Sequence, residues 1–148
     1  MNVVPFEAWH TSFIRRKLND PEIFLNFLDW SKTSYAVQRL SAAYTIIDSG
    51  KIVVSAGMFK LWKGTGEIWI YYGDDSYTPD RRLSVIKTMR RYLQIFMHEF
   101  ELTRMQGGVR ADRPQFIKFA KLFGFKEEGL MRNYSKQNDD VLMMAKYG

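Results

Sequence analysis

Two adjacent arginines, Arg81 and Arg82, give this chain a way to bind an anion. They follow Pro79-Asp80, where a proline at the first helical position and an acid in the first turn are typical of a helix start. A helix N-terminus attracts negative charge, and guanidinium groups bind phosphate oxygens through paired N–H donors. The net charge of +6 suits a nucleotide cofactor, nucleic acid or an acidic protein face. The alternative interpretation is a solvated basic helix end.

Several other chemistries lack the residues that they require. The chain has no cysteine, which excludes disulfide bonds, thiolate nucleophiles and cysteine metal ligands. His10 and His98 are too few for a histidine-based metal cluster, and no Gly-x-Ser-x-Gly elbow occurs. We therefore expect no metal site, and we expect His98 on the surface of a helix.

The sequence shows neither a signal peptide nor a membrane-spanning stretch. Residues 1–7 have no basic region followed by an apolar run, and nowhere do about 18 uncharged apolar residues occur together. The absence of cysteine is compatible with a reducing compartment. We expect a cytoplasmic protein with no membrane partner. Its 148 residues fit a single domain, residues 1–148.

The first forty residues are predicted to be mostly helical. Asp20-Pro21-Glu22 is a helix-start pattern, and apolar residues follow it at helical spacing. Residues 6–18 form a weaker helix candidate, and residues 31–40 are ambiguous.

A strand pattern begins near residue 43. Residues 44–47 and 52–59 are predicted to form a hairpin around the turn at 48–51. Gly57 within the second strand indicates a bulge or a close backbone approach. Residues 67–72 are apolar on both faces after Glu67, which is typical of a strand near the centre of a sheet.

The longest helix is predicted to begin at Pro79. One side of it carries apolar residues, namely Leu83, Ile86, Met89, Leu93, Phe96, Met97 and Phe100. A strand at 105–110, a helix after Ala111, a strand from Phe125 and a strand at 141–145 complete the chain. This order indicates one mixed domain.

The block Lys121-Leu122-Phe123-Gly124-Phe125-Lys126-Glu127-Glu128-Gly129-Leu130-Met131-Arg132 resembles the end of GNAT-superfamily N-acetyltransferases, in which a helix stops at glycine and a strand begins at phenylalanine. The order of elements from about Ala43 to the C-terminus is also similar. The resemblance implies an α/β (α+β) GNAT fold: a mixed central sheet of about six to seven strands, helices on both faces, and splayed fourth and fifth strands. The strand Gly66-Glu67-Ile68-Trp69-Ile70 is similar to small GNAT-like proteins of short-tailed bacteriophages.

The resemblance implies acetyl-CoA as the cofactor and suggests residues that would bind it. By position, the family's phosphate-binding turn matches Arg81-Arg82-Leu83-Ser84-Val85-Ile86, with Ser84 and Ile86 where the family has small residues. Backbone amides of Ile70, Tyr71 and Tyr72, facing Gly107, Gly108 and Val109, would bind the pantetheine arm. Arg113 stands where a relative has asparagine at the start of the next helix.

The same resemblance suggests catalytic candidates. The base that deprotonates the amine would be Glu67, Asp74 or Asp75, or a water held by one of them. The family's thiolate-protonating tyrosine corresponds to Ala120, and a relative's serine corresponds to Phe116. Tyr134 is therefore the substitute candidate, beside the alternative of a core or edge tyrosine.

Three functions remain open from the sequence. The first is transfer of an acetyl group from acetyl-CoA to an amine of a protein or small molecule. The second is a GNAT-fold protein without turnover that binds a partner protein, which Ile86, Ala120 and Phe116 favour. Nucleic-acid binding comes third, because no RNA or DNA motif accompanies the basic residues. The phage resemblance implies action on a host target in the cytoplasm of an infected bacterium. The acceptor and the oligomeric state, monomer or homodimer, stay undetermined.

Overall fold

The computed structural model describes residues 1–13, 30–72, 78–135 and 137–148. Its elements, in chain order, are β1 (Asn2–Pro5), the 3-10 helix η1 (Ala8–Phe13), α1 (Trp30–Leu40), β2 (Ala42–Asp48), β3 (Lys51–Trp62), β4 (Thr65–Tyr72), α2 (Pro79–Glu99), β5 (Arg104–Arg110), α3 (Pro114–Leu122), β6 (Lys126–Met131) and β7 (Val141–Tyr147). The helix start predicted at Asp20 and the candidate bases Asp74 and Asp75 lie outside the described residues.

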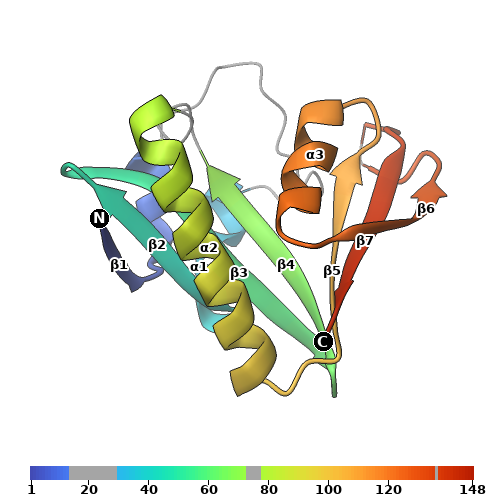
Figure 1. Ribbon diagram of the computed structural model, residues 1–148, viewed down its shortest axis with the longest axis horizontal. Coiled ribbons are helices and arrows are strands. Elements are labelled where there is room, and N and C mark those ends of the chain that lie inside the picture. Colours follow the sequence, from blue (N-terminus) through green and yellow to red (C-terminus); the bar gives the residue numbers. More distant parts are fainter. Residues whose placement is uncertain (14–29, 73–77, 136) are drawn as a thin grey trace.

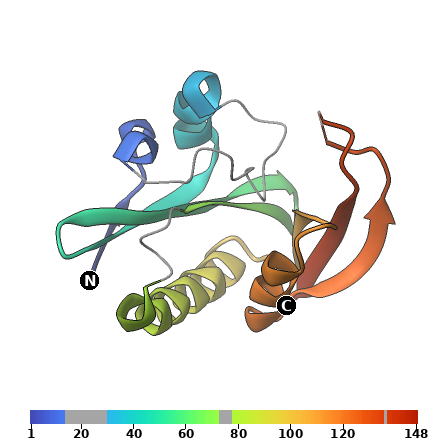
Figure 2. The same ribbon diagram turned by 90° about the horizontal axis from the view of Figure 1, so that it is seen from above.

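The strands form one seven-stranded sheet in the order β1-β2-β3-β4-β5-β7-β6 (Figure 1). The β4–β5 pair is parallel and the other five pairs are antiparallel. Figure 2 shows α2 and α3 on one face of the sheet and η1 and α1 on the other. The predicted mixed sheet with helices on both faces is therefore confirmed.

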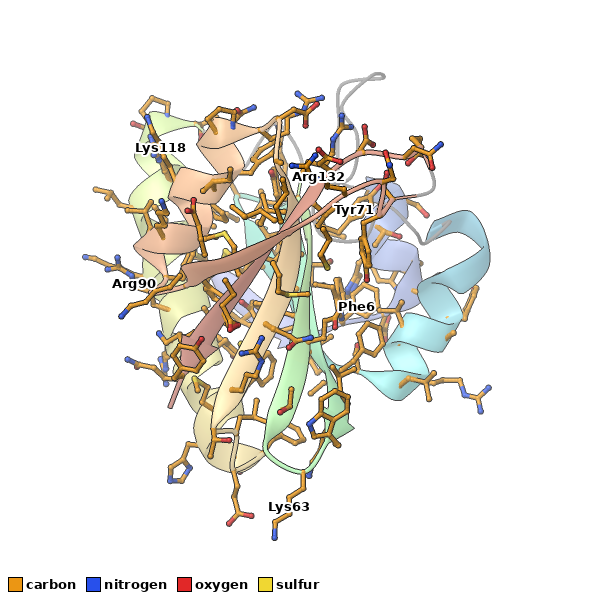
Figure 3. The ribbon with its side chains drawn as sticks, turned by 90° about the vertical axis from the view of Figure 1, so that its right-hand side faces the viewer. Phe6, Lys63, Tyr71, Arg90, Lys118 and Arg132 are labelled. Atoms are coloured by element: carbon orange, nitrogen blue, oxygen red, sulfur yellow. The ribbon has the colours of Figure 1, made fainter. Side chains whose placement is uncertain are left out.

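Alternation along β4 divides its side chains between two cores. Ile68, Ile70 and Tyr72 belong to the larger core, which lies against α2 and α3. Trp69, fully buried, belongs to a smaller core with Phe6 and Val37. Figure 3 places Phe6 and Tyr71 on the η1 and α1 side of the sheet, and Arg90 and Lys118 on the α2 and α3 side.

Two predictions concern the β2–β3 hairpin: its turn at residues 48–51 and the role of Gly57 within β3. Ser49 and Gly50 have positive φ values of 50° and 74°, as a two-residue hairpin turn of the primed type requires. A Cβ on Gly57 would lie 2.6 Å from the Ala42 carbonyl oxygen, so the close backbone approach is confirmed. The bulge interpretation is wrong, because the register of β3 with β4 shifts between Lys60 and Trp62 instead.

Two sequence-based expectations are corrected. Residues 2–5 form an edge strand paired with β2 that the sequence pattern did not predict, because β2 supplies a pairing edge that local periodicity does not reveal. The other described elements of the first forty residues, η1 and α1, are helical. Leu83 is 69% exposed, although it was expected on the apolar side of the long helix. Val85 is buried there instead, and two residues along a helix correspond to a rotation of roughly 200°.

Candidate functional site

The two central parallel strands separate after a short contact. The β4–β5 ladder consists of three pairs, Thr65 with Arg104, Gly66 with Met105 and Glu67 with Gln106. Beyond Glu67, β4 continues its pairing with β3, and beyond Gln106, β5 continues its pairing with β7. The predicted splay of the fourth and fifth strands of the GNAT pattern is therefore confirmed. Ile70, Tyr71 and Tyr72 lie on the diverging part of β4.

A pocket of about 320 Å³, open to solvent, lies beside this divergence. Its walls come from β3, β4, α2 and α3 and consist of Val54, Ile70, Tyr72, Arg82, Val85, Ile86, Met89 and Phe119. Arg82 brings the only charge to this lining among the described residues. The lining therefore offers apolar contacts and, at one place, a positive charge for an anionic group.

The paired arginines of the sequence have different surroundings in the structure. Arg81 donates from Nε to Asp48 Oδ2 at 2.6 Å, and its side chain is 12% exposed. The Met1 ammonium lies 3.8 Å from the same carboxylate. Arg81 therefore ties the start of α2 to the β2–β3 turn, while Arg82 lines the pocket.

The N-terminus of α2 presents little backbone donor capacity. Pro79 has no N–H, and the N–H groups of Arg81 and Arg82 both donate to the Thr78 carbonyl at 3.0 Å. Leu83 and Ser84, predicted to bind cofactor, are exposed on the following turn. An anion at this end of the pocket would depend on the Arg82 side chain more than on main-chain amides.

Glu67 lies at the last paired position of β4, on the face of the sheet opposite α2 and α3. Its Oε2 accepts a hydrogen bond from Gln106 Nε2 at 3.3 Å, and its side chain is half-buried. The carboxylate therefore lies at the root of the gap between β4 and β5.

Gln106 joins Glu67 to a polar network that crosses β5, β7 and β6. Arg104 donates from Nε to Gln106 Oε1 at 2.8 Å. Its other two nitrogens contact both oxygens of Glu128, at 3.0 and 2.6 Å. Tyr147 donates its hydroxyl to Glu128 Oε2 at 2.9 Å. The hydrogen bond to Glu128 raises the pKa of Arg104, and the hydrogen bond from Arg104 lowers the pKa of Glu128.

The sequence did not single out this network. A signal was present, because Arg104 and Gln106 alternate with the buried residues Met105 and Gly107, which is typical of a strand with one polar face. Glu128 stands at the β6 bulge between Glu127 and Gly129, so its direction could not follow from simple alternation.

A buried polar chain lies beneath η1. His10 Nδ1 accepts from the Glu7 N–H at 3.0 Å and lies 2.8 Å from Thr45 Oγ1, which in turn lies 2.8 Å from Ser55 Oγ. Burial lowers the pKa of His10, and nearby Glu7 acts in the opposite direction. Two hydrogen-bonding neighbours at Nδ1 favour a neutral ring whose proton is on Nε2. These hydrogen bonds hold η1 against β2 and β3.

Tyr134 lies away from Glu67. It follows β6 in the connection to β7, where its N–H donates to the Asp139 carbonyl at 3.0 Å, and its side chain is 51% exposed. Glu67 is level with Gln106 and Ala145, whereas the connection begins beyond Val141. Four residues of a strand span about 13 Å. The structure therefore does not bring these two catalytic candidates together.

Arg113 precedes α3 at the open end of the gap. Its Nε lies 4.0 Å from Asp112 Oδ1, and its side chain is 30% exposed. One turn later Phe116 packs against Tyr72, with ring centroids 6.0 Å apart. Phe116 and Ala120 are both buried, so they serve the contact between α3 and the sheet.

The described part of the chain shows no features of a metal site or of a membrane-spanning helix. No group of three or more histidine, aspartate or glutamate side chains suited to a metal ion occurs within residues 1–13, 30–72, 78–135 and 137–148. Within the same residues, no helix has the length and apolar character needed to cross a membrane. His98, predicted on a helix surface, has an 89% exposed side chain on α2.

Comparisons with known proteins identify the fold. No protein-family model matches the chain, and no curated protein matches it. A mutant spermidine N-acetyltransferase from Vibrio cholerae superposes with a TM-score of 0.72 at 12% identity, covering 99% of this chain and 95% of that one. A GNAT-family acetyltransferase from Streptococcus pneumoniae gives 0.71 at 15% identity and 99% coverage of both chains.

A GNAT-family acetyltransferase from Bacillus anthracis is similar at a TM-score of 0.71 and 13% identity, covering 98% of this chain and 93% of that one. The chain therefore has the GNAT fold, as predicted from the sequence. Because one fold can carry many functions, this similarity does not assign roles to individual residues.

Proposed function

We propose that this protein transfers an acetyl group from acetyl-CoA to an amine. The proposal rests on one juxtaposition. Where β4 and β5 separate, a mostly apolar pocket with Arg82 as its charged lining residue lies on one face, and the Glu67 carboxylate lies at the last paired position on the other. The similarity to solved GNAT acetyltransferases supports it.

The lining of the pocket fits the cofactor. Ile70, Val85 and Met89 offer apolar contacts to a pantetheine arm, and Arg82 offers a guanidinium to a phosphate. The diverging stretch Ile70-Tyr71-Tyr72 offers backbone groups to the amides of that arm. We assign phosphate binding to Arg82 in preference to Arg81, which is held by Asp48. Arg113, at the open end of the gap, is a secondary candidate.

The chemistry requires a proton acceptor for the amine. When bound, acetyl-CoA supplies a thioester whose carbonyl carbon is attacked by a neutral amine nitrogen. A C–N bond forms, the C–S bond breaks, and the amine loses a proton. We assign that proton to Glu67, directly or through a water. Tyr134 remains a candidate to protonate the departing thiolate only if the 132–140 connection moves toward β4.

Isothermal titration calorimetry with acetyl-CoA, followed by mass spectrometry of acceptors, tests this function. The acceptor panel contains spermidine, the substrate in the name of one structural neighbour, together with a lysine peptide and a peptide with a free N-terminus. Saturable binding and a mass increase of one acetyl group on any amine are expected. Absence of acetyl-CoA binding would overturn the proposal.

A second candidate is a GNAT-fold protein that binds a partner protein without turnover. Two features favour it: Ile86 occupies the pocket wall, and the buried residues Phe116 and Ala120 stand where the resemblance implies polar groups. The resemblance to phage proteins extends both candidates to host proteins in the bacterial cytoplasm. Acetyl transfer to any amine of the panel would decide for the enzyme.

A further inference from the structure

A chain of hydrogen bonds reaches Glu67 from the far edge of the sheet. It begins at Tyr147 and Glu128, passes through Arg104 and Gln106, and ends at Glu67 Oε2. Of these five residues, Glu67 was predicted from the sequence to be a site residue, and the other four were not. Arg104 and Gln106 alternate along β5 with core residues packed toward α2 and α3, so their side chains lie on the opposite face, as does that of Tyr147, the partner of Arg104. No described helix covers this face of β5, β7 and β6 (Figure 2).

Arg104 determines which way the Gln106 amide faces. A guanidinium can only donate hydrogen bonds, so the atom that contacts Arg104 Nε at 2.8 Å must be the amide oxygen. The amide nitrogen then faces Glu67, where it donates to Oε2 at 3.3 Å. The contact with Arg104 therefore removes the flip that would otherwise place an amide oxygen against a carboxylate oxygen.

Arg104 is itself fixed from two sides. Glu128 accepts from two of its nitrogens, a paired geometry that restricts the guanidinium plane. Its guanidinium carbon lies 5.9 Å from the centre of the Tyr147 ring, which pairs with Arg104 across the β5–β7 ladder. The orientation of the Gln106 amide thus depends on Arg104, and through it on Glu128 and Tyr147.

We infer that Gln106 is a positioning residue for Glu67, oriented by Arg104, and that it holds one carboxylate oxygen so that the other faces the acceptor amine. This inference rests on the proposed acetyl transfer. A glutamate side chain has three rotatable bonds, and a fixed donor on one carboxylate oxygen reduces the orientations that the carboxylate adopts. Gln106 would act through Glu67 without touching the substrate.

The competing explanation is that Gln106 merely braces Arg104 within the sheet. Gln106→Glu separates the two. A glutamate keeps the size of the side chain and still accepts from Arg104, so a bracing role survives, whereas the donor to Glu67 is lost and replaced by a like charge. Gln106→Met removes both hydrogen bonds with little change of volume. Gln94→Met, on the exposed side of α2, is the matched control.

The experiment is a double-mutant cycle on the full chain, with the best amine of the panel and saturating acetyl-CoA. We expect Gln106→Met and Gln106→Glu each to lower kcat about tenfold with little change in the KM for acetyl-CoA, a size typical of groups that orient a reacting residue. The double variant Glu67→Gln/Gln106→Met should retain kcat within about threefold of Glu67→Gln alone, because Gln106 would have nothing left to position. Thermal unfolding checks that each variant folds.

The outcomes are distinct. Full activity of Gln106→Glu, or losses that multiply in the double variant, would overturn the positioning role while leaving the transferase intact. If Gln106→Met does not fold, Gln106→Glu still decides, because it retains the contact with Arg104. A wild-type protein that acetylates no amine would instead overturn the proposed function, and this inference with it.

Discussion

The two faces of β4 differ in kind although their residues alternate along one strand. Toward α2 and α3, Ile70 and Tyr72 enter a large apolar core and line the pocket. On the opposite face Glu67 joins a network of charged and amide groups that continues over β5 and β7. A single strand therefore carries an apolar pocket wall on one face and a carboxylate within a polar network on the other. The comparison predicts that substitutions on one face change cofactor affinity, and substitutions on the other change turnover.

The largest effect is expected for Glu67→Gln. It keeps the shape of the side chain and removes its ability to accept a proton, so kcat should fall about 100-fold or more, the range for general bases. The dissociation constant for acetyl-CoA should stay within about twofold, because Glu67 lies on the other face from the pocket. Steady-state kinetics and calorimetry measure the two quantities. A weakened dissociation constant with unchanged kcat would reverse the comparison.

Arg82→Ala tests the pocket face. We expect acetyl-CoA to bind about tenfold more weakly, since an exposed charged hydrogen bond contributes modestly. Arg81→Ala should leave binding unchanged and instead lower the free energy of unfolding by about 1 kcal/mol through loss of its contact with Asp48.

Arg91→Ala, exposed on α2, is the control for loss of a positive charge on this helix. Calorimetry and urea unfolding would be run on all three variants. Equal weakening by Arg81→Ala and Arg82→Ala would show that the two arginines act as the pair predicted from sequence.

Ile86→Ala sharpens the comparison within the pocket. Ile86 is half-buried and lines the wall, so its truncation should widen the pocket, strengthen acetyl-CoA binding a few-fold and cost about 1 kcal/mol of unfolding free energy. Calorimetry measures the first effect and urea unfolding the second. Unchanged acetyl-CoA binding would mean that the Ile86 side chain does not limit entry of the cofactor into the pocket.

The smallest effect is expected for the buried hydrogen bonds of His10, Thr45 and Ser55 beneath η1. The pKa of His10 is lowered in the folded state, so the unfolded state binds a proton more readily as pH falls. Its stabilising contribution is present above the unfolded pKa of 6.5 and is lost as pH falls through the folded pKa. His10→Gln should flatten the decline of unfolding free energy below about pH 6.5.

His98→Gln, at a histidine of α2 whose side chain is 89% exposed, serves as the control for the loss of a histidine. Urea unfolding at a series of pH values measures both variants. The same pH dependence in His10→Gln and in the wild-type protein would exclude His10 as the source of the decline in unfolding free energy.

Local patterns predicted much of the fold. The hairpin at 48–51, the helix at Pro79 and the order of elements after Ala43 were found from spacing and turn residues, because these depend on neighbours in the chain. The edge strand Asn2–Pro5 was missed, since its only support is the partner strand β2. Leu83 was placed on the wrong side of α2 because periodicity gives a helix an apolar stripe without its exact rotation.

The candidate site divides in the same way. Glu67, Arg82 and the diverging stretch 70–72 were nominated through the resemblance to GNAT proteins, which suggests roles by position in the order of elements. Tertiary structure decided that Arg81 contacts Asp48, that Tyr134 lies far from Glu67, and that Gln106 and Arg104 reach the carboxylate. These facts depend on strand register and on the side chains that meet across neighbouring strands, and neither is encoded by residues close together in sequence.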